Sequence, residues 1–205
     1  MRLFHYHLVT SAIVNVEARY IGKLGFHLVA RYGRVDDEHV SVEPGVSWEQ
    51  LERRGFKLRL TELERGAVNI VVQPGHWRVP RVDHIGVALD DEEYESVLGR
   101  AMHDRLRVTE HGGRRTFVAT NAGYRLEIHP PREWIEELLA AGTEWSLTEL
   151  QLRVDDVDSK TAALAGLLGL DRDGDGDAVD IGGTIVRFVE GGPEGRPELH
   201  AERFK

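Results

Sequence analysis

Cysteine is absent from this sequence of 205 residues, which excludes disulfide bonds and thiolate metal sites. Any metal must therefore bind nitrogen or oxygen atoms. Long apolar runs are also missing, because none approaches the ~20 residues that a membrane span needs. The N-terminus has no basic segment followed by an apolar core, so it does not resemble a signal peptide. We therefore expect a cytoplasmic protein with no membrane partner.

Positive charge is scarce as well. Lysine and arginine total 26 against 35 aspartate and glutamate residues, which gives a formal net charge of −9. Because no basic run could follow a phosphate backbone, nucleic acid is not an expected partner. A hydrophobic content of 41% and a charged content of 30% are ordinary for a globular protein. The length suits one large domain or several small units that share a core.

The order of the predicted elements repeats along the chain. The first pass is predicted as a strand, a helix, a strand and a hairpin, at 3–9, 14–24, 26–32, 56–61 and 67–73. The helix should bury the face that carries Val14, Ala18 and Ile21. Residues 36–54 have the character of an insertion, with a short helix that Ser47 caps.

Two further passes follow the same order. The second is predicted as a strand, a helix and three strands, at 83–89, 91–102, 106–110, 116–120 and 124–129. The third is predicted as a strand, a helix and a hairpin, at 148–154, 157–168, 178–181 and 184–189. A helix at 132–141 should connect the second pass to the third. The tail from Gly191 is rich in glycine and proline, and we expect it to wrap the surface or fray.

The sequence therefore predicts an α+β fold of three tandem βαβββ modules. Their expected ranges are 1–78 with an insertion at about 34–55, 79–145 with the connecting helix, and a degenerate module at 146–205. One such unit cannot bury its sheet alone, whereas two side by side can form a curved sheet with a cleft inside and helices outside. We expect the first two modules to form this cleft. The third is then unpaired, so we expect it to pair with its copy in a second subunit and give a homodimer.

Strand alternation gathers polar side chains on single faces of three predicted strands. In the strand at 83–89, His84 shares a face with Gly86 and Ala88, whose small size should leave room for a ligand. In the N-terminal strand, His5 and His7 share a face.

The strand at 124–129 places Arg125, Glu127 and His129 on one face. An acid and two bases are costly to bury unless they are paired or bound to a metal. Together these strands offer two or more imidazoles and one carboxylate, which is a common metal-binding set.

The order of the units, the strand Asp83–Leu89 and the strand Gly123–His129 resemble the vicinal oxygen chelate superfamily. That superfamily includes glyoxalase I, bleomycin-resistance proteins, fosfomycin-resistance proteins, methylmalonyl-CoA epimerase and extradiol dioxygenases. The resemblance covers almost the whole chain and is more specific for fold than for reaction.

In that superfamily, the first and last strands of each unit carry the metal ligands. By position, the resemblance implies His5, His84 and Glu127 as ligands of a divalent metal such as Fe, Mn, Zn or Ni. Whether His5 or His7 is the first ligand stays open.

Two positions differ from the residues that known branches of the superfamily have there. The fourth glyoxalase-type ligand would fall at Ile70, which cannot bind a metal, and Asn69 is expected to face the other side of its strand. The tyrosine typical of extradiol dioxygenases is replaced by Phe117. In the third module the matching positions are Glu149 and Arg187, which we expect to pair with each other.

The implied function is a metal-dependent enzyme that acts on a small oxygenated substrate, in a dioxygenase-like or a glyoxalase/isomerase-like reaction. His129, His7 and His111 are candidate catalytic acids or bases, and the first two could instead orient metal ligands. One alternative is a small-molecule binding protein of the bleomycin-resistance kind, without catalysis. Another is a structural or regulatory module with a vestigial cleft.

Two more features have ordinary and functional interpretations. The run Asp171–Asp177 resembles the start of an EF-hand loop, but Gly182 stands where that loop needs a glutamate, so we interpret it as an acidic turn. The pairs Arg53–Arg54 and Arg114–Arg115 are either solvated or placed to meet an anionic substrate at the mouth of the cleft.

Overall fold

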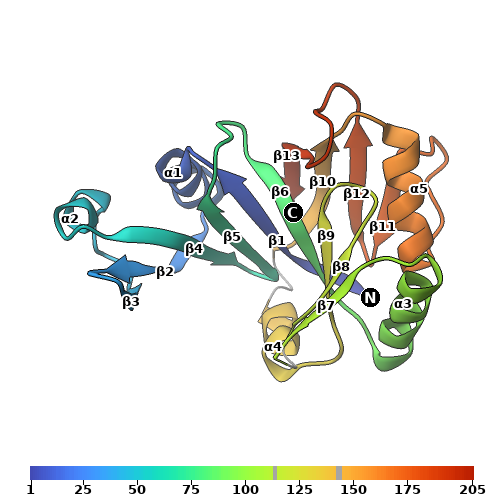
Figure 1. The fold of residues 1–205 in the computed structure, drawn as a ribbon, viewed down its shortest axis with the longest axis horizontal. Coiled ribbons are helices and arrows are strands. Elements are labelled where there is room, and N and C mark those ends of the chain that lie inside the picture. Colours follow the sequence, from blue (N-terminus) through green and yellow to red (C-terminus); the bar gives the residue numbers. More distant parts are fainter. Residues whose placement is uncertain (113–114, 142–144) are drawn as a thin grey trace.

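The computed structural model describes residues 1–112, 115–141 and 145–205, and it shows a mixed α+β fold with one curved sheet of 13 strands (Figure 1). The helices are α1 (Ile13–Leu24), α2 (Trp48–Arg53), α3 (Asp91–His103), α4 (Glu133–Ala141) and α5 (Val157–Leu168). The strands are β1 (Arg2–Thr10), β2 (His27–Val35), β3 (Glu38–Val42), β4 (Lys57–Arg65), β5 (Val68–Pro74), β6 (Arg81–Ala88), β7 (Val108–His111), β8 (Arg115–Ala119), β9 (Arg125–His129), β10 (Leu147–Arg153), β11 (Ala178–Ile181), β12 (Thr184–Val189) and β13 (Glu198–Phe204).

Strands β1 and β6 lie side by side in the middle of the sheet. They pair antiparallel with each other, and each also pairs in parallel with the last strand of its own unit, β5 for β1 and β9 for β6. The first and last strands of the two units therefore lie next to one another in the sheet, in the order β5, β1, β6 and β9 (Figure 1). The arrangement brings together the strands on which the candidate site residues lie.

One side of these central strands forms the hydrophobic core. Tyr6, Leu8, Ile85 and Val87 are fully buried there, together with side chains of α1, α3 and α5. Because side chains alternate along a strand, the histidines of β1 and β6 lie on the opposite side. The core thus holds the strands in place and leaves the histidine face free of helices α1, α3 and α5.

Helix α1 buries a different stripe from the predicted one. Val14 and Ile21 are 49% and 39% exposed, whereas Ile13, Val16 and Tyr20 are buried. The predicted face was wrong because both stripes fit a period of 3.6 residues, and the larger Tyr20 decides which one faces the core.

The predicted insertion contains β3 and α2, which extend the sheet beyond β2 at one end of the molecule (Figure 1). Ser47 caps α2 as predicted, and Gln50 completes a capping box with it.

Of the two outcomes expected for the C-terminal tail, wrapping the surface or fraying, fraying is wrong for its last residues. Residues Glu198–Phe204 form β13, which pairs antiparallel with β10 and meets β6 at Arg81. The strand covers one edge of β10, so that edge is not open to a second subunit. The homodimer stays a prediction.

Strand β13 also contacts β1 on the side that faces the hydrophobic core. The hydroxyl groups of Tyr6 and Tyr20 lie 3.1 Å apart, and both donate to the carboxylate of Glu202, which also pairs with Arg19 at 2.7 Å. Burial is the largest cause that raises the pKa of both phenols and the charge of Glu202 adds to it, so they stay protonated donors. This network ties α1 and β13 to the strand that carries His5.

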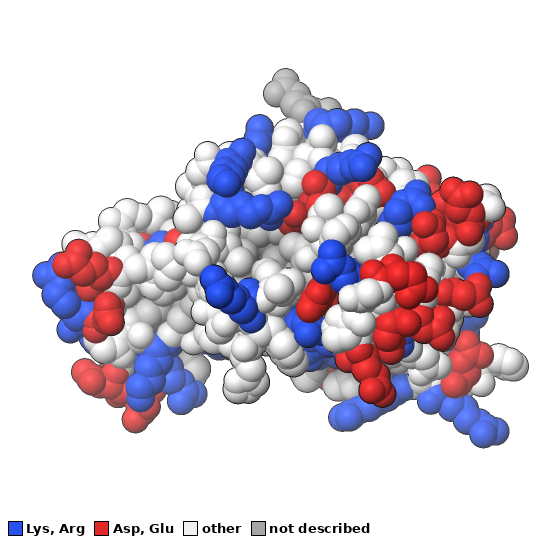
Figure 2. Space-filling model, turned by 90° about the horizontal axis from the view of Figure 1, so that it is seen from above, with Lys and Arg blue, Asp and Glu red and all other residues white. Residues whose placement is uncertain are grey.

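Charge on the surface is unevenly distributed. On the face in Figure 2, acidic side chains gather toward the end that carries α3 and α5, and basic ones are scattered. Among the described residues, no helix has the length and apolar character to span a membrane.

Replacing Tyr20 with phenylalanine should lower the free energy of unfolding by about 1.5–3 kcal/mol, because the variant loses a hydrogen bond to a buried charged group. Urea denaturation measures the effect. Val14→Ala, on the exposed side of α1, is the control and should change the free energy of unfolding by less than about 0.5 kcal/mol. Equal stability of Tyr20→Phe and wild type would show that the bond to Glu202 does not fasten α1.

Candidate metal centre

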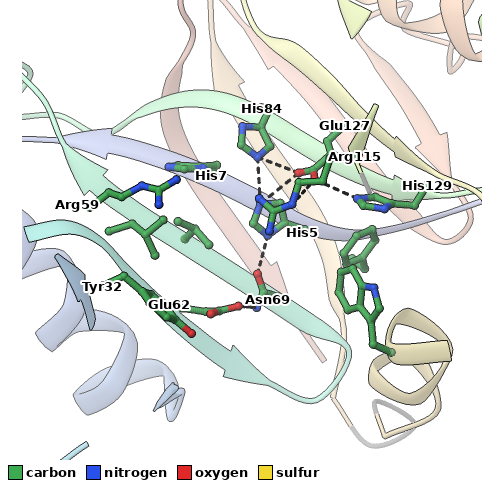
Figure 3. Close-up of a pocket in the computed structure, with 14 residues that line it drawn as sticks. His5, His7, Tyr32, Arg59, Glu62, Asn69, His84, Arg115, Glu127 and His129 are labelled. Atoms are coloured by element: carbon green, nitrogen blue, oxygen red, sulfur yellow. Dashed lines mark hydrogen bonds and ion pairs between the residues drawn. The ribbon is translucent and has the colours of Figure 1, made fainter. Parts of the chain in front are cut away.

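A cavity of about 360 Å³ lies on the histidine face of the central strands (Figure 3). Its lining includes histidines of β1, β6 and β9, Asn69 of β5 and Trp134 of α4. The helix predicted as a plain connection therefore contributes to the wall of the cavity.

The register of the strands places the candidate ligands next to one another. His5 is opposite Asn69 on one side and Gly86 on the other, and Gly86 is opposite Glu127. A Cβ atom on Gly86 would lie only 2.8 Å from the Cβ of His5. The room that the sequence predicted for a ligand at Gly86 is therefore taken by the side chain of His5.

Three donor atoms converge in the cavity. Nε2 of His5 lies 3.2 Å from Nε2 of His84, and Oε2 of Glu127 lies 3.0 Å from the His84 atom and 3.9 Å from the His5 atom. All three side chains are buried. Because metal bonds to nitrogen and oxygen are about 2.0–2.2 Å long, ligand atoms that share one ion lie roughly 3–3.5 Å apart, close to these separations.

The protonation of His5 follows from its neighbours on β4 and β5. The side-chain nitrogen of Asn69 donates to the carboxylates of Glu62 and Glu64, at 2.8 and 2.9 Å. The amide oxygen of Asn69 therefore faces His5 and accepts a hydrogen bond from Nδ1 at 2.7 Å. Nε2 of a neutral His5 is then unprotonated and carries a free lone pair.

Asp83 fixes His84 in the same way. Its carboxylate lies 2.8 Å from Nδ1 of His84, which must be the donor, and also pairs with Arg125 and Arg196. Burial raises the pKa of Asp83, but hydrogen bonds from His84 and Arg125 outweigh that and hold the pKa well below its usual range. Nε2 of a neutral His84 is therefore also unprotonated.

Two lone pairs thus face each other across 3.2 Å, beside a carboxylate. Such an arrangement is repulsive unless a proton or a cation lies between the atoms. Burial, with the charge of His84 as a second cause, lowers the pKa of His5 to about 4, so His5 stays neutral at neutral pH and either a proton on His84 or a cation must lie between the two atoms. Two nitrogen atoms and a carboxylate at these separations are a donor set that fits a divalent cation.

His129 orients the carboxylate of Glu127. Its Nε2 lies 3.0 Å from Oε1, the oxygen that faces away from His84. Burial raises the pKa of Glu127, but the hydrogen bond from His129 and the neighbouring imidazoles of His84 and His5 hold it well below its usual range. Of the two roles expected for His129, this position fits that of a residue that orients a ligand.

His7 offers a second possible ligand from β1. Its Nε2 is buried and has no hydrogen-bond partner among the described residues. The ligand atoms of His5, His7 and His84 all lie within 4.8 Å of one another. Burial, followed by the charges of His84 and His5, lowers the pKa of His7 to about 2, which keeps its ring neutral. A set of three histidines is therefore an alternative to the set with Glu127.

Two other residues lie elsewhere than the sequence predicted. His111 is exposed on β7, and its ring contacts Phe117 instead of lining the cavity. Asn69 was predicted to face away from the cleft, which is wrong, because it lines the cavity beside His5. The hairpin before β5 turns in fewer residues than the one before β9, so counting from the turn glycine gave the wrong face.

Some lining residues had no signal in the sequence. Three elements supply them: β2 carries Tyr32, β4 carries Arg59 and Glu62, and α4 carries Trp134. Of the arginine pairs considered, Arg115 lines the cavity, Arg53 and Arg54 do not, and Arg114 lies outside the described residues.

In the third unit, Glu149 and Arg187 pair as predicted, with Nε and Oε1 3.0 Å apart. Arg187 also pairs with Asp173 and Asp177 of the acidic turn. A guanidinium group thus lies where an EF-hand loop would hold its cation.

The sequence matches no protein-family model and no curated protein. Among solved structures, the Mn(II)-bound glyoxalase of Novosphingobium aromaticivorans is 9% identical with a TM-score of 0.59, over 98% of this chain and 64% of that one. A 4-hydroxymandelate synthase variant of Streptomyces coelicolor is 13% identical with a TM-score of 0.65, over 99% and 70%. The homoprotocatechuate 2,3-dioxygenase of Brevibacterium fuscum, in complex with 3,4-dihydroxyphenylacetate, is 15% identical with a TM-score of 0.57, over 100% and 63%. At these identities the likeness concerns the fold, and this chain spans about two thirds of the length of those proteins.

Lowering the pH should destabilise the metal-free protein through His5. Its pKa is about 4 when folded and 6.5 ordinarily, so its stabilising contribution is complete above pH 6.5 and is lost as the pH falls toward 4. Between pH 7 and pH 5 this amounts to about 2 kcal/mol. Urea denaturation at the two pH values measures the free energy of unfolding, and His5→Gln should lose about that much less of it than the wild type between pH 7 and pH 5. The control His103→Gln, on the exposed end of α3, should lose as much as the wild type. An equal loss in His5→Gln and wild type would contradict the assignment.

Proposed function

We propose, from the vicinal oxygen chelate fold of this chain and from its cavity, that the protein is a metal-dependent enzyme. In this proposal His5, His84 and Glu127 hold a divalent Fe, Mn, Zn or Ni ion, and the substrate is a small molecule with neighbouring oxygen atoms. The units at 1–78 and 79–145 supply the site. The observation that carries the proposal is the convergence of two imidazole Nε2 atoms and one carboxylate in a cavity.

When bound, a divalent ion supplies Lewis acidity to two neighbouring substrate oxygens and stabilises the negative charge that develops on them. The protein groups prepare the site for this. Asn69 and Asp83 fix the tautomers of the two histidines, and His129 holds the carboxylate of Glu127. His7 presents an unpaired Nε2 that can accept a hydrogen bond from a substrate hydroxyl.

The reaction is proposed to be dioxygenase-like or glyoxalase/isomerase-like. Phe117 packs its ring 5.1 Å from that of His84, at the position where extradiol enzymes have a tyrosine. No phenol from that position can donate a proton, which favours the isomerase-like branch. The metal itself separates the branches, because iron suits oxygen chemistry and zinc or nickel suits isomerisation.

Metal analysis by elemental mass spectrometry tests the proposal. The wild type should hold about one equivalent of Fe, Mn, Zn or Ni, because a preformed site binds tightly. His84→Ala and Glu127→Ala should lose it, since each removes a ligand. His111→Ala is the matched control, because His111 lies outside the cavity, and it should keep the metal.

A protein that takes up no metal after reconstitution at neutral pH would contradict the proposal. It would leave a small-molecule binding protein of the bleomycin-resistance kind as the function to test. Loss of metal in His84→Ala but not in Glu127→Ala would instead select the three histidines as ligands.

Removal of the Asn69 side chain should weaken metal binding without removing a ligand. In Asn69→Ala, Nδ1 of His5 loses its acceptor, and we expect the metal dissociation constant to rise about 10–100-fold. Competition with a chelator measures it. Asn15→Ala deletes the same group from the exposed side of α1 and should leave the constant unchanged. An unaltered constant in Asn69→Ala would show that the hydrogen bond does not orient His5.

A further inference from the structure

The formal charges of the residues that line the cavity cancel, so a bound divalent ion would leave the cavity positive. The positively charged lining residues are Arg59 and Arg115, and the negatively charged ones are Glu62 and Glu127. Both glutamates already have donors, because Glu62 accepts from Asn69 at 2.8 Å and Glu127 accepts from His129 at 3.0 Å. A divalent ion would add two further positive charges. The completed cavity therefore favours an anionic ligand.

Arg59 is the more available of the two arginines. It projects from β4 into the cavity, on the same side of the site as His7 (Figure 3). It makes no hydrogen bond or ion pair with any described residue, whereas Arg19, Arg31 and Arg187 all pair with carboxylates. A guanidinium group that points into a cavity without a carboxylate is set to bind one from a ligand.

Arg115 lies on the other side of the same opening. Its Nε is 3.7 Å from Oε1 of Glu127, and its side chain is 64% exposed (Figure 3). It is partly engaged by a metal-ligand candidate, so we assign it a contribution to the positive potential and not the principal contact with a ligand.

An aromatic wall closes a further side of the cavity. The rings of Phe4 and Trp134 meet edge to face at 5.8 Å, and His129 packs against both, at 5.6 and 5.7 Å. Trp134 is 50% exposed although it lines the cavity, so its ring has free area to cover a ligand. This wall suits an apolar or aromatic body.

We propose that the substrate is a small carboxylate with a flat apolar body, and that Arg59 binds its carboxylate while its neighbouring oxygens face His5, His84 and Glu127. The proposal rests on the proposed function, because the neighbouring oxygens need the metal. It adds a substrate class and a specificity residue. Arg59 can form two parallel hydrogen bonds with a carboxylate, which fixes the ligand in one orientation relative to the three metal ligands.

Two probes that differ by one carboxylate test this inference. The zinc-loaded protein would be titrated by calorimetry with 3,4-dihydroxyphenylacetate and with 4-methylcatechol, which share the neighbouring hydroxyl groups. We expect the carboxylate probe to bind at least about tenfold more tightly, the usual effect of one charge-assisted hydrogen bond. Equal affinity of the two probes, or no binding of the carboxylate probe, would overturn the inference.

Variants of Arg59 locate the effect. In Arg59→Gln, the advantage of the carboxylate probe should shrink to less than about threefold while the affinity for 4-methylcatechol stays the same. Arg59→Lys keeps the charge but not the two parallel donors, and should retain part of the advantage. Arg53→Gln removes an exposed arginine of α2 outside the cavity and serves as the matched control. A full advantage in Arg59→Gln would contradict the role of Arg59.

Zinc content is measured on every sample before titration. A wild type without zinc would contradict the proposed function itself. Zinc-loaded wild type without preference for the carboxylate would contradict only the substrate class.

Discussion

The close approach of two imidazole nitrogens, Nε2 of His5 and Nε2 of His84, is the constraint on which the site depends. Asn69 and Asp83 hold a proton on each Nδ1, so the Nε2 lone pairs of the neutral rings face each other at 3.2 Å and repel unless a proton or a cation lies between them. Asn69 and Asp83 are therefore as much a part of the site as the ligands. The arrangement is a preorganised place for a cation, held by groups that are themselves buried and hydrogen-bonded.

The fold makes this approach possible. The strands that carry the two histidines are neighbours in the centre of one sheet, and the glycine opposite His5 leaves space for its side chain. On the far side, Tyr6, Tyr20 and Glu202 anchor the same strand to α1 and β13. The tail, which contributes no lining residue to the cavity among the described residues, thus supports the strand that supplies two of its histidines.

Local pattern was enough to predict much of this. The mixed α+β class follows from the repeated order of elements. Strand alternation grouped polar side chains on single faces, and the resemblance to the vicinal oxygen chelate superfamily implied His5, His84 and Glu127 as the ligands. Local pattern failed where the outcome depends on a competition or a long-range contact. Two stripes of α1 were equally periodic. The shorter turn before β5 reversed the side on which Asn69 lies, and the tail became a strand only because β10 offered it an edge. Arg59 and Trp134 reach the cavity from elements far apart in the sequence, so no spacing could reveal them.

The most direct test of the account is the position of the metal in a crystal of the protein soaked with zinc, found by anomalous diffraction. The account predicts one peak about 2.0–2.2 Å from Nε2 of His5, Nε2 of His84 and Oε2 of Glu127 together. A peak bound by His7 without Glu127 would replace the ligand set. No peak in the cavity at full zinc occupancy elsewhere would contradict the central claim that these three atoms form a metal site.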